Sequence, residues 1–516
     1  MGMFSTEQFE QVCDRAKAFV SSSHFILWSI PCIMLARLLA SSPADPDLFA
    51  RVAMGRLALS LTYVPLQDPF AFTPTLSTWI DHEWLSGVVF YLVTTAAGDA
   101  GLVLLKALLS TSSALLVILA SKRYAPDFPS RFLWITLCLL HASAAWTSTL
   151  RCQAFTYLFI PMLYWAINDY RKHQRLFALA LSPVMAVAWV NMHGGYALGC
   201  VLVALLIGVE VVQKRLSGAL VAIALGWLLA PIFTPYGWTR FVSFLIGSLG
   251  MERPGILEWA PLFDDISAGL LTLLLCIPLF TGMLLSRGKG DLFGIAALLF
   301  STYCAFRHIR FLPFFMITAA IFGAPYVQAL CERLRTLRPH LFTATVRCGA
   351  LVSVALVGAV AVQLLVTVVS PSAYRMNYKN FPIGAVEWMR SQETRGKLLV
   401  DFNTGSYALW RLYPNMKISV DGRYEECYPE STVRDNALAL RPDLEVGRAA
   451  LERFDPTHIL VPLNLNLKNP ETAFGEGWSV VYRDPQAIIL SHVRAQEGIS
   501  TMDTALVPKD MWRPEF

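Results

Sequence analysis

The sequence predicts a polytopic α-helical membrane protein with a water-facing α/β domain near its C-terminal end. Mean hydropathy is +0.49, and charged residues make up 15% of the 516 residues, whereas a soluble chain carries about 25%. The charge is also unevenly distributed: Asp, Glu, Lys and Arg form about 24% of residues 370–516 but only about 12% of residues 1–369. In the charged part, short apolar strands alternate with helices, which indicates an α/β fold. A wholly soluble protein is therefore excluded.

Residues 1–369 are expected to form the membrane domain, with about 11 spans, because one span needs about 20 mostly apolar residues. The first apolar run could also be a signal peptide, but its long polar flank favours an uncleaved span. The expected spans are residues 23–40, 101–121, 131–149, 153–168, 176–192, 196–213, 217–234, 268–286, 291–305, 309–330 and 343–369.

Orientation depends on a short apolar run at residues 84–98, which could either cross the membrane or lie along its surface. If this run does not cross, the basic loops at residues 122–131, 171–175, 214–215, 287–289 and 333–338 all fall on one side. Basic loops mark the cytoplasmic side. We therefore expect a juxtamembrane helix at 84–98, a cytoplasmic N-terminus and a C-terminal domain outside.

This topology places most polar motifs at the outer ends of the spans. The first outer segment, residues 41–98, carries Asp45, Asp47 and Asp68 and the His82-Glu83 pair, and later outer corners carry further Arg and His residues. Any one of them could be a helix cap or a side chain that snorkels to the interface. Ionisable groups gathered at one depth, however, usually mark a site. The nearly uncharged span centres argue against a transporter.

Residues 370–498 are expected to form the outer α/β domain, and residues 499–516 a poorly ordered tail. Strands are predicted at residues 397–401, 417–421, 458–462, 478–482 and 487–490, with helices from about residues 381 and 406. Asp401, Asn403, Asp421 and Arg423 follow two of these strands, where α/β folds form ligand sites. Asp421 and Arg423 could instead simply pair with each other across a turn.

Several function classes lack their sequence signals. The chain has no G-x-G-x-x-G, Walker or H-E-x-x-H motif. It has no C-x-x-C pair, so neither a disulfide framework nor a zinc site is expected. The net charge of +5 includes no long basic run, so nucleic acid is not an expected partner.

The polar motifs, taken in order, resemble the GT-C superfamily, integral membrane glycosyltransferases that use polyprenyl-phosphate-linked sugars. The motifs that carry the resemblance are DPDLFARVAMGR, VPLQDPFAFT, HEWL, RCQAFTYLF, WVNMHGGYALG, TPYGW, EWAP, RHIRFLPF and DGRYE. They are similar to those of a bacterial family of GT-C-like proteins. Such relatives often carry aromatic residues and a His after the acidic motif, where this chain has Leu48-Phe49-Ala50-Arg51.

The resemblance implies a sugar transfer on the outer face of the bacterial cytoplasmic membrane, from a polyprenyl-phosphate sugar to a hydroxyl of a glycan, lipid or protein. Inversion needs a base opposite the leaving group, and Asp47 is the first choice, then Asp45, with Asp68 in support. A divalent cation, Mg²⁺ or Mn²⁺, held by these three carboxylates would also be consistent. Residues expected to bind the donor phosphate are His82, Glu83, Arg151, His193, Arg307, His308 and Arg310. The outer-domain residues Asp401, Asn403, Asp421 and Arg423 are expected to contact the acceptor.

Two other functions stay open at this point. The same scaffold could transfer a preassembled glycan, as an oligosaccharyltransferase or ligase does. It could also be a non-enzymatic membrane component of a polysaccharide assembly or export machine.

Overall fold

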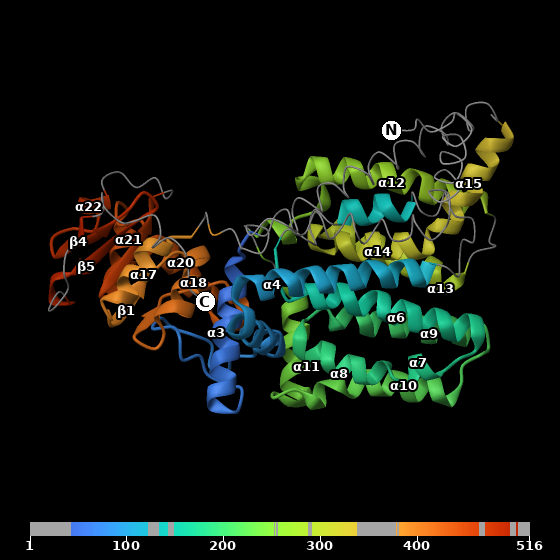
Figure 1. Ribbon diagram of the computed structural model, residues 1–516, viewed down its shortest axis with the longest axis horizontal. Helices are drawn as coiled ribbons and strands as arrows, with labels where there is room; N and C mark the ends of the chain where they lie inside the picture. Colours follow the sequence, from blue (N-terminus) through green and yellow to red (C-terminus); the bar gives the residue numbers. More distant parts are fainter. Residues whose placement is uncertain are drawn as a thin grey trace, which may run out of the picture.

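The computed structural model describes residues 43–121, 134–142, 149–251, 253, 256–286, 291–337, 378, 381–463, 470–495 and 502–503. The predicted spans 23–40 and 343–369, about half of the one at 131–149, and the predicted tail at 499–516 apart from residues 502–503 lie outside these residues. The described chain forms a bundle of long, roughly parallel helices with a mixed α/β part at one end of it (Figure 1).

Most bundle helices occupy predicted spans. Pro161 and Pro278 lie inside two of these helices, which is tolerated where neighbouring helices re-satisfy the freed backbone groups. The helices are α4 (Trp84–Ser121), α6 (Gln153–His173), α7 (Phe177–Ala180), α8 (Ser182–Met192), α9 (Tyr196–Val212), α10 (Gly218–Leu229), α11 (Gly237–Gly250), α12 (Ile266–Leu285), α13 (Leu292–Arg307), α14 (Leu312–Phe322) and α15 (Ala324–Leu337).

The apolar helices place the chain in a membrane. Within the described ranges, α4 and α12 are each long and apolar enough to cross a bilayer. Two bent pairs, Gly218–Phe233 with Gly237–Ser248 and Ile309–Phe322 with Ala324–Leu334, would each supply one more span, and α8, α9 and α13 are apolar but shorter. The count of about 11 spans for the whole chain stays a prediction.

Helix α3 (Pro46–Leu61) runs across the end of the bundle (Figure 1). It begins where Asp45 caps it, the Oδ1 atom accepting from the backbone N–H of Asp47 at 3.0 Å, with Pro46 at its first position. A Cβ atom on Gly55 would lie 2.1 Å from the carbonyl oxygen of Gly87 in α4. The two helices therefore cross in backbone contact, which only glycine permits.

Helix α4 is broken at Gly98, whose φ of 52° and ψ of −143° are not helical. A left-handed φ of this kind favours glycine. The break separates residues 84–97 from the long apolar remainder of the helix. It therefore lies where the sequence analysis separates a surface helix at 84–98 from a span at 101–121.

The α/β part is built on a six-stranded sheet with the order β2-β1-β3-β5-β4-β6. The strands β2, β1 and β3 are parallel, whereas β5 is antiparallel to both of its neighbours. Five strands lie at or close to the predicted positions; the sixth is short. The strands are β1 (Gly396–Leu399), β2 (Met416–Ile418), β3 (His458–Pro462), β4 (Trp478–Arg483), β5 (Ala487–His492) and β6 (Met502–Asp503).

Helices cover both faces of this sheet. Alternate residues of β3 belong to different cores: Leu460 packs in one core, and Ile459 and Val461 pack in the other. Helices α17 (Ile383–Ser391) and α18 (Phe402–Leu412) contribute to the first core, and α20 (Glu430–Ala439) and α21 (Glu445–Phe454) to the second.

The first outer segment extends the sheet at its β2 edge. Ile418 donates its N–H to the carbonyl of Phe70 at 3.1 Å and accepts from the N–H of Phe72 at 3.0 Å. Ala71 pairs with Ile418 as a parallel bridge. Added strands of this kind satisfy an exposed sheet edge, so the segment between α3 and α4 is bound to the α/β part by backbone hydrogen bonds.

A buried arginine reinforces the same junction. The Arg423 side chain is 1% exposed; its Nη1 lies 2.6 Å from Asp68 Oδ1 and its Nη2 lies 2.7 Å from Asp421 Oδ2. Its guanidinium lies 4.8 Å from the ring centre of Trp79 and 5.1 Å from that of Phe70. Arg423 thus pairs with both Asp421 and Asp68, whereas the sequence analysis assigned Asp421 and Arg423 to the acceptor.

The substitution Arg423→Met should destabilise the protein, because it leaves the two buried carboxylates Asp68 and Asp421 without a positive partner. Breaking a buried pair in this way costs roughly 3–5 kcal/mol. Thermal unfolding of the detergent-solubilised protein should therefore begin several degrees lower. As a matched control, Arg441→Met removes the arginine of a surface pair with Asp443 in the same sheet unit and should not move the transition. Equal transitions for the two variants would contradict this assignment.

Candidate active site

A cavity of about 880 Å³ opens where the ends of the bundle helices meet α3 and the α/β part. Its wall combines α3 with the turns before α4, α6, α9 and α14, and with segments of the α/β part. The acidic, basic and histidine side chains that line it are Asp47, Arg51, His82, Glu83, Arg151, His193, Glu258, Arg310 and Glu426. The structure therefore brings together polar motifs from most of the predicted outer corners.

Asp47 lies in the first turn of α3, with 40% of its side chain exposed. On its other side it packs against Gly422, where a Cβ atom would lie 2.3 Å from its Oδ1. Burial in the cavity wall, followed by repulsion from Asp45, raises the pKa of Asp47 to about 7. It is thus an accessible carboxyl group that gains and loses its proton near neutral pH.

Asp45 lies behind Asp47 and is almost fully buried, with 2% of its side chain exposed. Its Oδ2 accepts from Arg151 Nε at 2.5 Å, and Arg151 Nη1 lies 2.9 Å from Glu258 and 3.7 Å from Asp47. Arg310 lies on the far side of Glu258, at 3.7 Å, with its guanidinium over the ring of Trp259. Arg151 is therefore bound to carboxylates on three sides.

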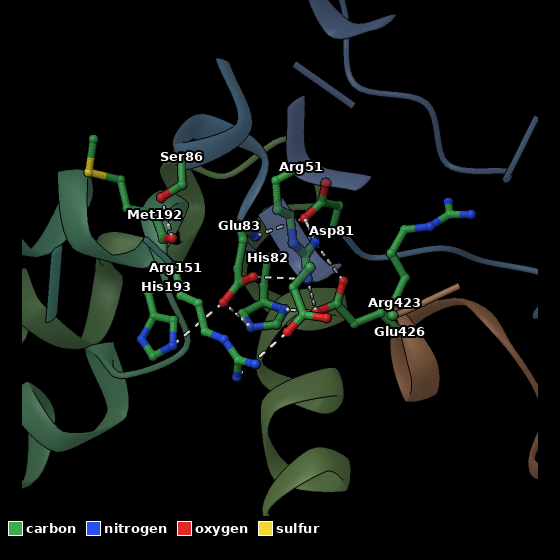
Figure 2. A network of polar contacts seen from close by, with 12 residues as sticks. Arg51, Asp81, His82, Glu83, Ser86, Arg151, Met192, His193, Arg423 and Glu426 are labelled. Carbon is green, nitrogen blue, oxygen red and sulfur yellow. Dashed lines mark hydrogen bonds and ion pairs between the residues drawn. The ribbon is translucent and has the colours of Figure 1, made fainter. Parts of the chain in front are cut away.

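A second cluster is centred on Arg51, which points from α3 toward the α/β part (Figure 2). Its Nη1 lies 2.6 Å from Asp81, and its Nη2 lies 2.8 Å from both Glu83 and Glu426. Burial opposes the charge, but these three carboxylates raise the pKa of Arg51 well above its usual range. Arg51 thus links α3, the turn before α4 and the helix α19 (Tyr424–Cys427).

His82 belongs to the same cluster. Its Nδ1 lies 3.1 Å from Glu426 and its Nε2 lies 3.7 Å from Glu83. Burial alone would lower the pKa of His82, but Glu426 and then Glu83 outweigh it and raise this pKa to about 9. The ring of His82 is therefore a cation at neutral pH, and its Nε2 side faces Gly194, where a Cβ atom would lie 3.1 Å away.

His193 has the opposite character. Its Nδ1 is 2.8 Å from Thr156 Oγ1, and its Nε2 is 3.5 Å from Glu83. Burial, with added repulsion from Arg310 and His82, lowers the pKa of His193 well below its usual range. It therefore stays neutral beside the charged His82 (Figure 2).

Of the remaining predicted site residues, one lines the cavity and the others make contacts outside it. Asn403 is exposed and lines the cavity, whereas Asp401 caps α18 by accepting from two backbone N–H groups. Arg307 ends α13, and the His308 ring contacts the carbonyl oxygen and the ring of Trp259. The predicted site residues that are not among those of the cavity wall are Asp45, Asp68, Arg307, His308, Asp401, Asp421 and Arg423.

The structure does not form the metal site that the sequence predicts from Asp45, Asp47 and Asp68. Asp45 is bonded to Arg151, and Asp68 to Arg423. Among the described residues, the ligand atoms of His82, Glu83 and Glu426 do lie within 4.8 Å of one another, as a metal site would require. Arg51 already bonds Glu83 and Glu426, so a metal ion bound here would have to compete with its guanidinium.

The sequence analysis does not assign four charged residues of these clusters to the site: Arg51, Asp81, Glu258 and Glu426. Arg51 had been noted only as a departure from related sequences, and Asp81 precedes the predicted His82-Glu83 pair. Glu426 lies 375 residues from Arg51 in the chain. Nothing in its local sequence distinguishes it from an exposed helical glutamate; its partners come only from the folded chain.

No family model and no curated protein matches the sequence. Solved structures do match it in fold. The chain superposes on the arabinofuranosyltransferase AftD from Mycobacteria with a TM-score of 0.53 and 14% identity, over 91% of this chain and 40% of that one. It shares its fold with a glycosyltransferase.

Other matches are weaker. The oligosaccharyltransferase AglB from Archaeoglobus fulgidus, in complex with an inhibitory peptide and a dolichol-phosphate, matches with a TM-score of 0.49 and 11% identity over 86% of this chain and 69% of that one. A second structure of the oligosaccharyltransferase from that organism, in complex with Zn and sulfate, matches with a TM-score of 0.46 and 12% identity. That match covers 90% of this chain and 73% of the other. All these similarities concern the fold; the reaction has to be argued from the cavity.

The substitution Glu426→Gln should lower the pKa of His82, because it removes the carboxylate that contributes most to raising it. Diethyl pyrocarbonate modifies only the neutral imidazole. At pH 7.5 His82 of the wild type should therefore react at least tenfold more slowly than His82 of the variant, as read by peptide mass spectrometry. Glu430→Gln, an exposed glutamate at the start of α20, is the matched control. Unchanged reactivity in Glu426→Gln would disprove the pairing.

Proposed function

We propose that this protein is a membrane glycosyltransferase that moves a sugar from a polyprenyl-phosphate-linked donor to an acceptor hydroxyl, with inversion. The observation that carries the proposal is Asp47: an accessible carboxyl group with a pKa of about 7, in a cavity that also presents cations. The fold shared with an arabinofuranosyltransferase supports the same reaction class.

Asp47 would act as the general base. The acceptor oxygen attacks the anomeric carbon, the bond from that carbon to the phosphate oxygen breaks, and the phosphate leaves with the electron pair. Asp47 takes the proton of the acceptor hydroxyl as the new bond forms. A base whose pKa lies close to the operating pH is suited to this step.

The leaving phosphate needs positive charge or hydrogen-bond donors. Protonated His82 and Arg310 line the cavity and are the two groups we assign to this task. His193 accepts at Nδ1 from the N–H of Gly195, so the neutral ring carries its proton on Nε2 and can donate one hydrogen bond there. His82 and Arg310 also have carboxylate neighbours, but fewer than Arg51 and Arg151, each of which lies within 3.7 Å of three carboxylates. Arg51 and Arg151 are therefore better suited to hold the site in shape.

The cavity wall also has an apolar side, which suits a lipid-linked donor. Phe244, Leu245, Leu257 and Phe314 belong to this wall. Leu257 is 82% exposed, and Ile246, which follows Leu245 in α11, is 66% exposed. Apolar side chains exposed beside a polar cavity would let a polyprenyl tail stay in lipid while its sugar phosphate reaches the charged groups.

The α/β part would face the acceptor. Phe402, Asn403 and Tyr424 line the cavity on that side, and the rings of Phe402 and Tyr424 lie edge to face at 6.0 Å. Asn403 offers an amide to an acceptor hydroxyl. We extend the proposal to location: residues 370–498 form an outer domain on the extracytoplasmic face of a bacterial cytoplasmic membrane, with the N-terminus inside.

The substitution Asp47→Asn should abolish transfer without unfolding the protein, since the amide keeps the shape but cannot accept the proton. Loss of a general base costs typically 10²- to 10⁴-fold. The measurement is transfer from a radiolabelled polyprenyl-phosphate sugar in proteoliposomes.

Asp264→Asn, an exposed aspartate just before α12, is the matched control and should retain wild-type rates. Full activity in a well-folded Asp47→Asn protein would show that Asp47 is not the general base. Transfer from a pyrophosphate-linked oligosaccharide alone would point to an oligosaccharyltransferase instead.

The rate of transfer should depend on pH through Asp47. Because its pKa is raised to about 7, the carboxyl group is mostly protonated below pH 7 and cannot act as a base. The rate should therefore fall about tenfold per pH unit below pH 7 and level off above pH 8. A rate that stays flat from pH 5 to pH 8 would contradict the proposed role.

A further inference from the structure

A chain of hydrogen bonds runs from Trp189 in α8 through Thr156 in α6 to His193 at the cavity. Trp189 Nε1 donates to Thr156 Oγ1 at 2.8 Å, and this oxygen lies 2.8 Å from His193 Nδ1. The backbone N–H of Gly195 donates to the same Nδ1 atom at 2.9 Å. All three side chains are buried, so the bonds between them are shielded from water.

The direction of each bond follows from the chemistry of its groups. An indole N–H can only donate, so Thr156 Oγ1 accepts from Trp189 and has its own hydrogen to donate to His193 Nδ1. The backbone N–H of Gly195 also only donates. Nδ1 therefore faces two donors and carries no hydrogen, and the ring keeps its hydrogen on Nε2.

The Nε2 side of His193 lies beside the charged ring of His82 (Figure 2). The Nε2 atoms of the two rings are 3.5 and 3.7 Å from the same Glu83 oxygen, and all three residues line the cavity. A phosphate that contacts His82 is therefore within reach of the Nε2–H of His193.

We propose that Thr156 and Trp189 are positioning residues for the transfer: they hold His193 as an uncharged hydrogen-bond donor whose Nε2–H binds an oxygen of the donor phosphate. The inference rests on the proposed function. Both residues act through His193 and need not contact the substrate. The chain also opposes a second proton on the ring, because a hydrogen on Nδ1 would break both bonds made there.

The space around Gly195 shows how closely this chain is packed. Gly195 has a φ of −57° and a ψ of −9°, a conformation that any residue adopts, so its backbone does not require glycine. A Cβ atom there would, however, lie 2.3 Å from Thr156 Oγ1 and 2.8 Å from His193 Nδ1. The contact with the chain is therefore what requires glycine at this position.

Trp189, at the end of the chain away from the cavity, is held by its neighbours. Its ring centre lies 5.4 Å from that of Phe159 and 6.1 Å from that of Trp227. A Cβ atom on Gly199 would lie 2.8 Å from the Trp189 ring. A ring packed this closely cannot turn without displacing its neighbours, so the direction of its N–H is fixed.

Binding of decaprenyl phosphate, a lipid carrier without its sugar, tests the proposal without requiring turnover. The full-length protein is purified in detergent and immobilised, and bound tritiated decaprenyl phosphate is read by scintillation proximity. His193→Ala should weaken binding about tenfold or more, because it removes a hydrogen bond to a charged group. Thr156→Val should weaken it about threefold to tenfold, and Thr156→Ser, which keeps the hydroxyl, should bind within about twofold of wild type.

Double variants separate positioning from packing. If Thr156 acts through His193, Thr156→Val should have no further effect in the His193→Ala background, because the group that it positions is gone. Trp189→Phe should weaken binding in the wild type but add nothing to Thr156→Val. A side chain that only packed the helices would weaken binding by the same factor in both backgrounds.

Substitutions at His193 test the charge of the donor group. The amide nitrogen of His193→Gln can take the place of Nε2, so this variant should bind within about threefold of wild type. The shorter side chain of His193→Asn does not reach that place, so this variant should bind as weakly as His193→Ala.

Thr302→Val is the matched control for Thr156→Val. The Thr302 hydroxyl, in α13, donates to the carbonyl of Leu298 in its own helix at 2.7 Å, so its loss should leave binding unchanged. Thermal unfolding of each variant establishes that it is folded, and Thr156→Ala replaces the valine variant if that one does not fold.

Three results would overturn the proposal. They are a folded Thr156→Val protein that binds like wild type, an equal loss with and without His193, and a His193→Gln protein that binds as weakly as His193→Ala. A wild type that binds no decaprenyl phosphate would overturn both this proposal and the proposed function. Normal binding without any sugar transfer would count against the proposed function alone.

Discussion

Buried carboxylates that must be neutralised are the constraint on which the rest of this structure depends. Three arginines meet it, each at a different place. Arg151 pairs with Asp45 and Glu258, Arg51 with the carboxylates before α4 and on α19, and Arg423 with Asp68 and Asp421. Each cluster joins segments distant in the chain, so these ion pairs exist only in the folded protein. Removing one partner would leave an uncompensated charge in a poorly hydrated interior.

Backbone packing gives these clusters their positions. The contact between Gly55 and Gly87 brings α3 tightly against the first part of α4, which places Asp47 and Arg51 over the end of the bundle. The segment that follows α3 then pairs with β2 at Ile418 and carries Asp68 to Arg423. The helix bundle and the α/β part therefore both contribute residues to the wall of the cavity. The cavity therefore has both an apolar side and a polar, charged side.

The sequence predicted the architecture better than the site. Apolar runs and strand patterns indicated most helices and five strands, because buried apolar residues recur with the period of the helix or strand that carries them. Seven residues assigned to the site in advance do line the cavity: Asp47, His82, Glu83, Arg151, His193, Arg310 and Asn403. Their grouping followed from topology, because residues at the same ends of neighbouring spans must lie near one another. The metal ligand set failed, since it was chosen by residue type alone.

Composition and hydropathy by themselves determined that this chain enters a membrane, that its charged part is an α/β unit, and that its polar motifs gather at one end of the helices. Only the tertiary structure decided which carboxylate is accessible and which is bonded to an arginine. In the sequence alone, nothing distinguishes Asp45, Asp47 and Asp68, three aspartates of the same segment. The fold pairs the first with Arg151 and the third with Arg423, and it leaves the second open to the cavity. The reason is physical: the charge state and role of a carboxylate depend on burial and on neighbours a few ångströms away, and those neighbours come from up to several hundred residues along the chain.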